Sequence, residues 1–309
     1  MALEIQYNSY EDGLGALAEA DERFVVMTAE NRSAIRNLPA RLGGRFIDVG
    51  ICEQTMIGAA AGLALRGRIP VVHALATFLT LRAFEFIRTD VGIAHLPVKL
   101  VGTFNGFGSE ANGPTHQSLE DVALMRGIPG VNVWCPSDQD DLLLGLDAVM
   151  NDPAPCYIRY AGNKAAAGHD QPFEIGRAEV WSEGSDATLL TYGPLLGECL
   201  TAAGLLREAG FSVGVVNMRM LKPVDIDAIL AAAGRSALLV TVEDHFKTGG
   251  LYSIVAETLV EHGQIAQVMP IAMDERWFKP ALLQDVLDYE GFTGSALAAR
   301  IKERLEGSR

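Results

Sequence analysis

Two ionisable side chains in the first half of the chain lie at the edges of predicted elements, where chemistry is usually carried out. Glu53 lies in the stretch DVGICEQ, which runs from an apolar strand into a helix of small residues. A lone glutamate in a first helical turn most often only complements the helix dipole. Here it is framed by Ile51, Cys52, Met56 and Ile57, and apolar surroundings favour a protonated carboxyl that can exchange a proton with a ligand nitrogen.

His116 is the second of these side chains and lies in the segment GPTHQ. The polar loop 106–117 follows a predicted strand, so it lies at the carboxyl end of that strand, where open α/β sheets bind their ligands. A histidine titrates near neutrality and can donate to a substrate oxygen. The alternative interpretation is a histidine that caps the helix after the loop.

Aromatic and apolar residues in the segment TFLTLRAF could form the wall of a binding pocket. Phe78, Leu81 and Phe84 would suit a flat heterocycle there. Taken alone, however, their helical spacing is also typical of ordinary core residues.

Arg159 and His245 are polar residues next to apolar strands. An arginine near the end of such a strand is costly unless it is paired. Arg159 could form a fork for a phosphate or carboxylate, or an intramolecular salt bridge, and the chemistry alone favours neither. For His245 we prefer a structural role.

An α/β scaffold is predicted to position these side chains. Apolar runs alternate with helical patterns, and the runs are continuous, as in a parallel sheet that is covered on both faces. Strands separated by helices imply βαβ units. In the first half we expect strands at 24–28, 45–49, 70–74, 98–103, 131–134 and 156–160, and helices near 53–66, 79–95, 118–126 and 138–150.

The alternation of strands and helices is interrupted after the sixth strand and then resumes. We therefore predict two domains with parallel-type α/β sheets, residues 1–165 and 187–309, joined by a linker at 166–186. In the second domain the expected strands are 187–192, 212–217, 237–243 and 265–271, and the expected helices lie near 194–209, 225–233 and 250–262.

Composition excludes several classes of protein. The 309 residues are 49% hydrophobic and carry a net charge of -14, which argues against a surface that binds nucleic acid. The four cysteines form no C-x-x-C pair, so reduced thiols are expected rather than a metal cluster or disulfides. No apolar run is long enough for a membrane span, and we expect a cytoplasmic protein. Phosphate-loop and G-x-S-x-G motifs are absent from the sequence.

The ordered set of motifs resembles the carboxyl-terminal half of the transketolase family of thiamine-diphosphate enzymes. The set comprises DVGICEQ, G-x-A-x-G-L-A-L, the TFL segment, GPTHQ, PSD at 136–138 and the strand Ile158-Arg159-Tyr160. Each motif is weak alone, but their order and spacing are specific. The resemblance covers essentially the whole chain and implies a pyrimidine-binding domain followed by the small carboxyl-terminal domain of the family.

The resemblance also implies roles for individual residues. Glu53 would hydrogen-bond N1′ of the cofactor's aminopyrimidine and so promote deprotonation of the thiazolium C2. Phe78 would stack on the pyrimidine. His116 would lie over the reactive carbon and hydrogen-bond the donor's hydroxyl or carbonyl. The remaining wall of the cofactor pocket would be Ile51, Leu81 and Phe84.

Substrate recognition departs from the family pattern. Arg159 would bind the phosphate of a sugar phosphate, but Asn112 stands where transketolases commonly have an aspartate that recognises the acceptor. A family histidine upstream in the same loop is replaced near Phe104 or Asn105, so the acceptor is left open.

The resemblance implies a split enzyme, because the family's metal and diphosphate motif lies in a preceding domain. The expected partner is an amino-terminal-half subunit in an α2β2 assembly. Thiamine diphosphate would lie at the shared interface, with Mg²⁺ held mainly by the partner and no metal ligand in this chain. The substrate would be a small sugar that provides a two-carbon ketol unit for an aldehyde.

Three alternatives remain open from the sequence. One is the β subunit of a 2-oxo acid dehydrogenase E1, which usually lacks GPTHQ. Another is chemistry of the 1-deoxyxylulose-phosphate-synthase type. The third is a non-catalytic scaffold that only completes the partner, against which the retention of Glu53, Phe78 and His116 argues.

Overall fold

Seven strands form the larger of two sheets in the computed structural model, which describes residue 3 and residues 5–307. The order is β10-β5-β6-β4-β3-β1-β2, and every neighbouring pair is parallel except β10 with β5. Their bounds are β1 (Phe24–Thr28), β2 (Phe46–Asp48), β3 (Ile69–Leu75), β4 (Lys99–Thr103), β5 (Asn132–Trp134), β6 (Cys156–Arg159) and β10 (Met220–Lys222).

Helices cover both faces of this sheet, as the continuous apolar strands require. Successive side chains of a strand point to opposite faces. Val26 therefore packs with α1 (Tyr10–Ala20) and α6 (Gln139–Asn151), whereas Val25 and Met27 pack with α3 (Glu53–Leu65) and α5 (Asp121–Arg126). The short helix α2 (Leu38–Leu42) adds to the α1 face.

The segment that the sequence predicted as one helix at 79–95 is irregular. π-helical turns at Phe78–Arg82 and Ile87–Gly92 flank the short helix α4 (Phe84–Phe86). Such turns occur often at functional sites because they change the direction of side chains locally.

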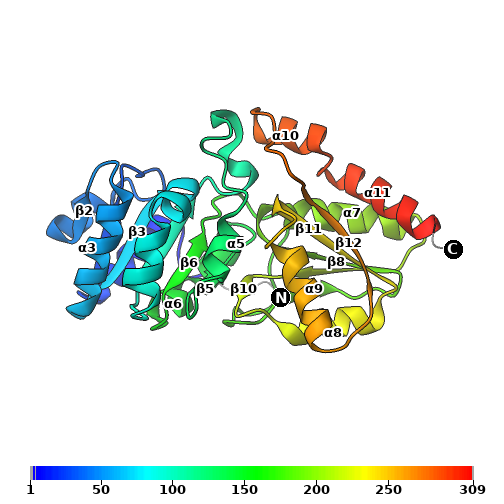
Figure 1. The fold of residues 1–309 in the computed structure, drawn as a ribbon, viewed down its shortest axis with the longest axis horizontal. Helices are drawn as coiled ribbons and strands as arrows, with labels where there is room; N and C mark the ends of the chain where they lie inside the picture. The colour runs from blue at the N-terminus through cyan, green and yellow to red at the C-terminus, as the bar shows by residue number, and fades with distance from the viewer. Residues whose placement is uncertain (1–2, 4, 308–309) are drawn as a thin grey trace.

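Five strands form the second sheet, which lies beside the first along the long axis of the molecule (Figure 1). The order is β12-β11-β8-β9-β7, and only β7 is antiparallel to its neighbour. The strands are β7 (Glu179–Ser182), β8 (Ala187–Thr191), β9 (Val213–Asn217), β11 (Leu238–Phe246) and β12 (Gln267–Met273). The helices are α7 (Leu196–Glu208), α8 (Ile226–Arg235), α9 (Leu251–Glu261), α10 (Leu283–Glu290) and α11 (Gly294–Glu306).

The α/β class with mostly parallel sheets is confirmed, but two strands lie outside the predicted pattern. Strand β7 falls inside the segment 166–186 that was expected as a linker. Strand β10 comes from the second half of the chain and yet completes the first sheet beside β5. Among the described helices, none combines the length and apolarity that crossing a bilayer needs.

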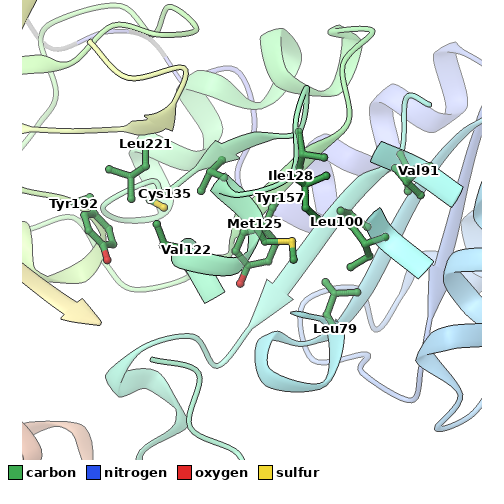
Figure 2. Close-up of a cluster of buried hydrophobic side chains, with 14 of the residues drawn as sticks. Leu79, Val91, Leu100, Val122, Met125, Ile128, Cys135, Tyr157, Tyr192 and Leu221 are labelled. Carbon is green, nitrogen blue, oxygen red and sulfur yellow. The ribbon is translucent and has the colours of Figure 1, made fainter. Parts of the chain in front are cut away.

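One hydrophobic cluster continues from the first sheet into the second half of the chain (Figure 2). It runs from Leu79 and Leu100 through Tyr157 to Tyr192 and Leu221, all of them buried. The two halves therefore share a core, which fixes their relative position more firmly than a polar contact would.

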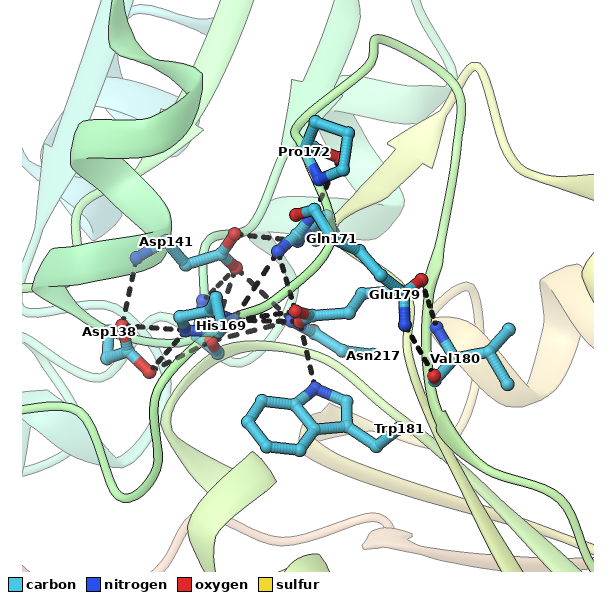
Figure 3. A network of polar contacts seen from close by, with 11 residues as sticks. Asp138, Asp141, His169, Gln171, Pro172, Glu179, Val180, Trp181 and Asn217 are labelled. Carbon is cyan, nitrogen blue, oxygen red and sulfur yellow. Dashed lines mark hydrogen bonds and ion pairs between the residues drawn. The ribbon is translucent and has the colours of Figure 1, made fainter. Parts of the chain in front are cut away.

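A buried polar network joins the same two halves at another point (Figure 3). His169 contacts Asp138 at 3.1 Å and Glu179 at 2.8 Å, and Arg219 pairs with Glu179 at 2.8 Å and with Asp141 at 2.7 Å. Burial alone would lower the pKa of His169, but its hydrogen bonds to the two carboxylates raise that pKa to about 10. His169 is therefore a buried cation at neutral pH.

This network gives the stability of the protein a predictable pH dependence. Because the pKa of His169 is about 10 when folded and about 6.5 when unfolded, its contribution is complete below pH 6.5 and is lost as pH rises toward 10. We expect His169→Gln to lower the free energy of unfolding by about 3–5 kcal/mol at pH 6. The deficit should shrink with rising pH in urea titrations.

The exposed His262 provides a control, since the one hydrogen bond of its ring to a described residue is with the carbonyl of Thr258. His262→Gln should change stability little at any pH. Parallel stability curves for wild type and His169→Gln between pH 6 and 10 would contradict the assignment.

Candidate active site

The loops after four adjacent strands of the first sheet enclose a cavity of about 410 Å³. Strands β4, β3, β1 and β2 are parallel neighbours, so their carboxyl ends meet at one edge. The structure thereby brings together four residues predicted from the sequence, Ile51, Glu53, Phe78 and His116. The complete lining is Ala29, Glu30, Asn31, Arg32, Ser33, Ile51, Glu53, Leu75, Phe78, Phe104 and His116.

Glu53 opens α3 and is only 1% exposed. Its Oε2 accepts a hydrogen bond from Nη1 of Arg82 at 2.7 Å. Its Oε1 makes no hydrogen bond to a described residue, so one oxygen of a buried carboxyl is left for a ligand. The expectation of wholly apolar surroundings needs correction, because a guanidinium is the nearest polar neighbour.

Arg82 was not predicted from the sequence as a site residue. Its guanidinium lies 4.2 Å from the ring centroid of Phe78, a cation–π contact, while it also holds Glu53. Its position four residues after Phe78 could have indicated this role, because that spacing puts both side chains on one side of a helical segment.

His116 and Phe78 meet edge to face, with ring centroids 5.1 Å apart. Nδ1 of His116 is 2.9 Å from Oγ1 of Thr115, and its Nε2 makes no hydrogen bond to a described residue. The Gln117 side chain donates to the Phe278 carbonyl at 2.8 Å, which ties the loop to the second domain. His116 therefore has a fixed backbone and a ring nitrogen available to a ligand.

Other predicted pocket residues lie away from this cavity. Leu81 is 47% exposed, Phe84 is half-buried against the core, and Asn112 is exposed in the loop. None of the three lines the cavity. Ile51 does line it and is 64% exposed, so it forms an apolar rim.

Arg159 requires a correction, because its guanidinium is enclosed in the protein. Nε pairs with Asp121 at 2.8 Å and Nη1 with Asp244 at 2.7 Å, and only 1% of the side chain is exposed. Of the two interpretations, the structure supports the intramolecular salt bridge. The guanidinium of Arg159 has no exposed surface that a substrate phosphate could contact. His245 is fully buried and accepts from the Ala123 backbone at 3.3 Å, in keeping with a structural role.

The loop 29–33 after β1 was also missed, although it supplies five of the lining residues. Its position at the carboxyl end of a predicted parallel strand could have indicated that it lines the site. Glu30 has a positive φ of 56°, which is uncommon for a side chain other than glycine and marks a locally strained loop.

Family models match both halves of the chain. Residues 7–165 match the pyrimidine binding domain of transketolase, and residues 176–297 match the transketolase C-terminal domain. The chain thus carries the pyrimidine-binding domain of a thiamine-diphosphate enzyme. A carboxyl oxygen, an aromatic ring and an apolar rim around one cavity fit an aminopyrimidine.

Several relatives share this domain content. The "6-deoxy-6-sulfo-D-fructose transketolase subunit SqwH" of Clostridium sp. (strain MSTE9) is 37% identical over 259 residues, which are 82% of this chain and 80% of that protein. One subunit of the apulose-4-phosphate transketolase of Phocaeicola vulgatus is 34% identical over 82% of this chain and 83% of its own length. The chain spans about half the length of the curated 1-deoxy-D-xylulose-5-phosphate synthases it matches, for example 47% of the one from Syntrophotalea carbinolica.

A solved structure is similar over nearly the whole chain. It is described as "Split gene transketolase, inactive beta4 tetramer" and has a TM-score of 0.87, 32% identity, and coverage of 97% of this chain and 98% of that one. The chain belongs to the transketolase family. It corresponds to the C-terminal subunit of the split, thiamine-diphosphate-dependent transketolases, which are enzymes of the transferase class.

The burial of Arg159 makes a prediction about stability. We expect Arg159→Gln to lower the free energy of unfolding by about 3–5 kcal/mol, because Asp121 and Asp244 would be left buried and unpaired. Urea denaturation followed by circular dichroism measures this. Arg23→Gln is the control, since Arg23 is 60% exposed in its pair with Asp21 and should have little effect. Equal stability of the two variants would contradict the assignment.

Proposed function

We propose that this chain supplies the pyrimidine-activating half of a two-subunit transketolase. The enzyme would transfer a two-carbon ketol unit from a ketose or ketose phosphate to an aldehyde. The observation that carries the proposal is the free Oε1 of Glu53 in the same cavity as Phe78 and His116. The names of the relatives from Clostridium and Phocaeicola support the same activity.

The residues of the cavity have distinct tasks in this proposal. Thiamine diphosphate, when bound, supplies the carbon nucleophile that breaks and forms bonds next to a carbonyl. Glu53 holds or accepts a proton at N1′ of the pyrimidine, and Arg82 fixes the carboxyl in place through its 2.7 Å hydrogen bond. Phe78 provides an aromatic surface, and His116 donates to a substrate oxygen.

The diphosphate end of the cofactor is assigned to a partner. The described residues contain no group of three or more His, Cys, Asp or Glu side chains arranged to hold a metal ion. We propose that an amino-terminal-half subunit holds the diphosphate through Mg²⁺ in an α2β2 assembly. The four cysteines are unpaired, which supports a reducing compartment such as the cytoplasm.

Co-expression with candidate amino-terminal-half subunits tests this function. The purified complex is assayed for ketol transfer from a ketose phosphate to a panel of aldehydes, with and without thiamine diphosphate and Mg²⁺. Cofactor-dependent transfer only in the complex supports the proposal. Release of CO2 from pyruvate without ketol transfer would move the chain to the decarboxylating branch, and a stable complex with neither activity would favour a scaffold.

Glu53→Gln is the decisive substitution for catalysis. The amide keeps the size of the side chain but cannot exchange a proton with N1′, so we expect kcat of the reconstituted complex to fall by about 10²–10⁴-fold. Glu85→Gln is the matched control, because Glu85 is exposed on α4 and does not line the cavity. Wild-type kcat in Glu53→Gln would favour the scaffold interpretation.

A further inference from the structure

A second cavity, of about 220 Å³, adjoins the first. Ser33 and Phe104 line both cavities, so a molecule whose reacting group lies in the first can extend past them into the second. The loops after β4 and β6 form most of its remaining wall, and Pro194 and Leu283 close it from the second domain.

Among the described residues, none that lines the second cavity carries a charge at neutral pH. Its wall contains no Lys, Arg, His, Asp or Glu among the described residues. Arg159, one residue before the lining Tyr160, is enclosed with Asp121 and Asp244. Arg32 lines the first cavity and not the second, and its Nε and Nη2 donate hydrogen bonds to the carboxylate of Asp48. An anion in the second cavity would therefore meet no cation among the described residues that line it, and an unpaired buried charge is costly.

The polar atoms that remain in the second cavity suit hydroxyl groups. The side-chain amide of Asn105 donates to the carbonyls of Gly102 and Tyr160, both at 3.0 Å. Its Oδ1 has no partner among the described residues and can accept from an O–H. The hydroxyls of Tyr160 and Ser33 can donate or accept, and burial raises the pKa of Tyr160, so its hydroxyl stays neutral.

The boundary between the two cavities is held in place by the backbone. Phe104 has a φ of 54°, in the left-handed region that a bulky residue rarely adopts. Such a conformation persists where the surroundings over-determine it. Here the two hydrogen bonds of the adjacent Asn105 fix the chain at this point.

We propose that the second cavity is a subsite for the far end of the substrate's carbon chain and that it accepts an uncharged, hydroxylated end rather than a phosphate. This inference rests on the proposed function, because the reacting carbonyl must lie in the first cavity beside His116. The substrate class is therefore a hydroxylated aldehyde or ketose whose end far from the reacting carbonyl carries no charge.

The test uses the reconstituted holoenzyme with D-glyceraldehyde and D-glyceraldehyde 3-phosphate as competing acceptors. For wild type we expect the higher kcat/KM with the neutral aldehyde. Gly108 lines the second cavity, and a Cβ added to it meets no atom of a described residue within 4 Å. Gly108→Arg should raise kcat/KM for the phosphorylated acceptor by about tenfold, and added salt should reduce that gain. Gly108→Gln, the uncharged control, should not raise kcat/KM for the phosphorylated acceptor.

The outcomes separate this inference from the proposed function. No ketol transfer to any acceptor means that the proposed function fails. Transfer in which wild type prefers the phosphorylated aldehyde overturns the inference alone and assigns the phosphate site to the partner. If Gly108→Arg does not assemble, Asn163→Arg introduces the charge from the opposite loop, and the preference of wild type decides the question in either case.

Discussion

The buried ion pairs of Arg159 join the two halves of the chain beneath the loop that carries His116. Arg159 ends β6 of the first sheet, and it pairs with Asp121 of α5 and with Asp244 of β11 in the second sheet. The loop that carries His116 passes directly over this group. At Gly106 an added Cβ would lie 1.8 Å from Oδ2 of Asp244, so only glycine allows so close an approach.

The second domain therefore takes part in the construction of the candidate active site. Its strand β11 holds the far end of the loop through the Phe246 amide, which donates to the Leu119 carbonyl at 2.7 Å. The Phe278 carbonyl holds Gln117 from another side. The result is two adjoining cavities of different character: Glu53 and His116 line the first, whereas the described residues that line the second are all neutral.

Local sequence was sufficient to predict the residues whose position follows from one strand and its loop. Glu53, Phe78 and His116 each come after a parallel strand, so their meeting at one sheet edge follows from topology. The partners of Arg159 could not be predicted, because Asp121 and Asp244 lie 38 and 85 residues away along the chain. Strand β10 was missed for the same reason: it pairs with β5 across the two halves, and three residues carry too weak a pattern.

If this chain forms only the pyrimidine half of a cofactor site, it should bind thiamine diphosphate weakly by itself. Isothermal titration of thiamine diphosphate with Mg²⁺ would be carried out on the chain alone and on its complex with the amino-terminal-half subunit. We expect stoichiometric binding by the complex and affinity at least about 100-fold weaker for the chain alone, since the diphosphate contacts would be missing. Equally tight, stoichiometric binding by the chain alone would show that the site is not divided between two subunits.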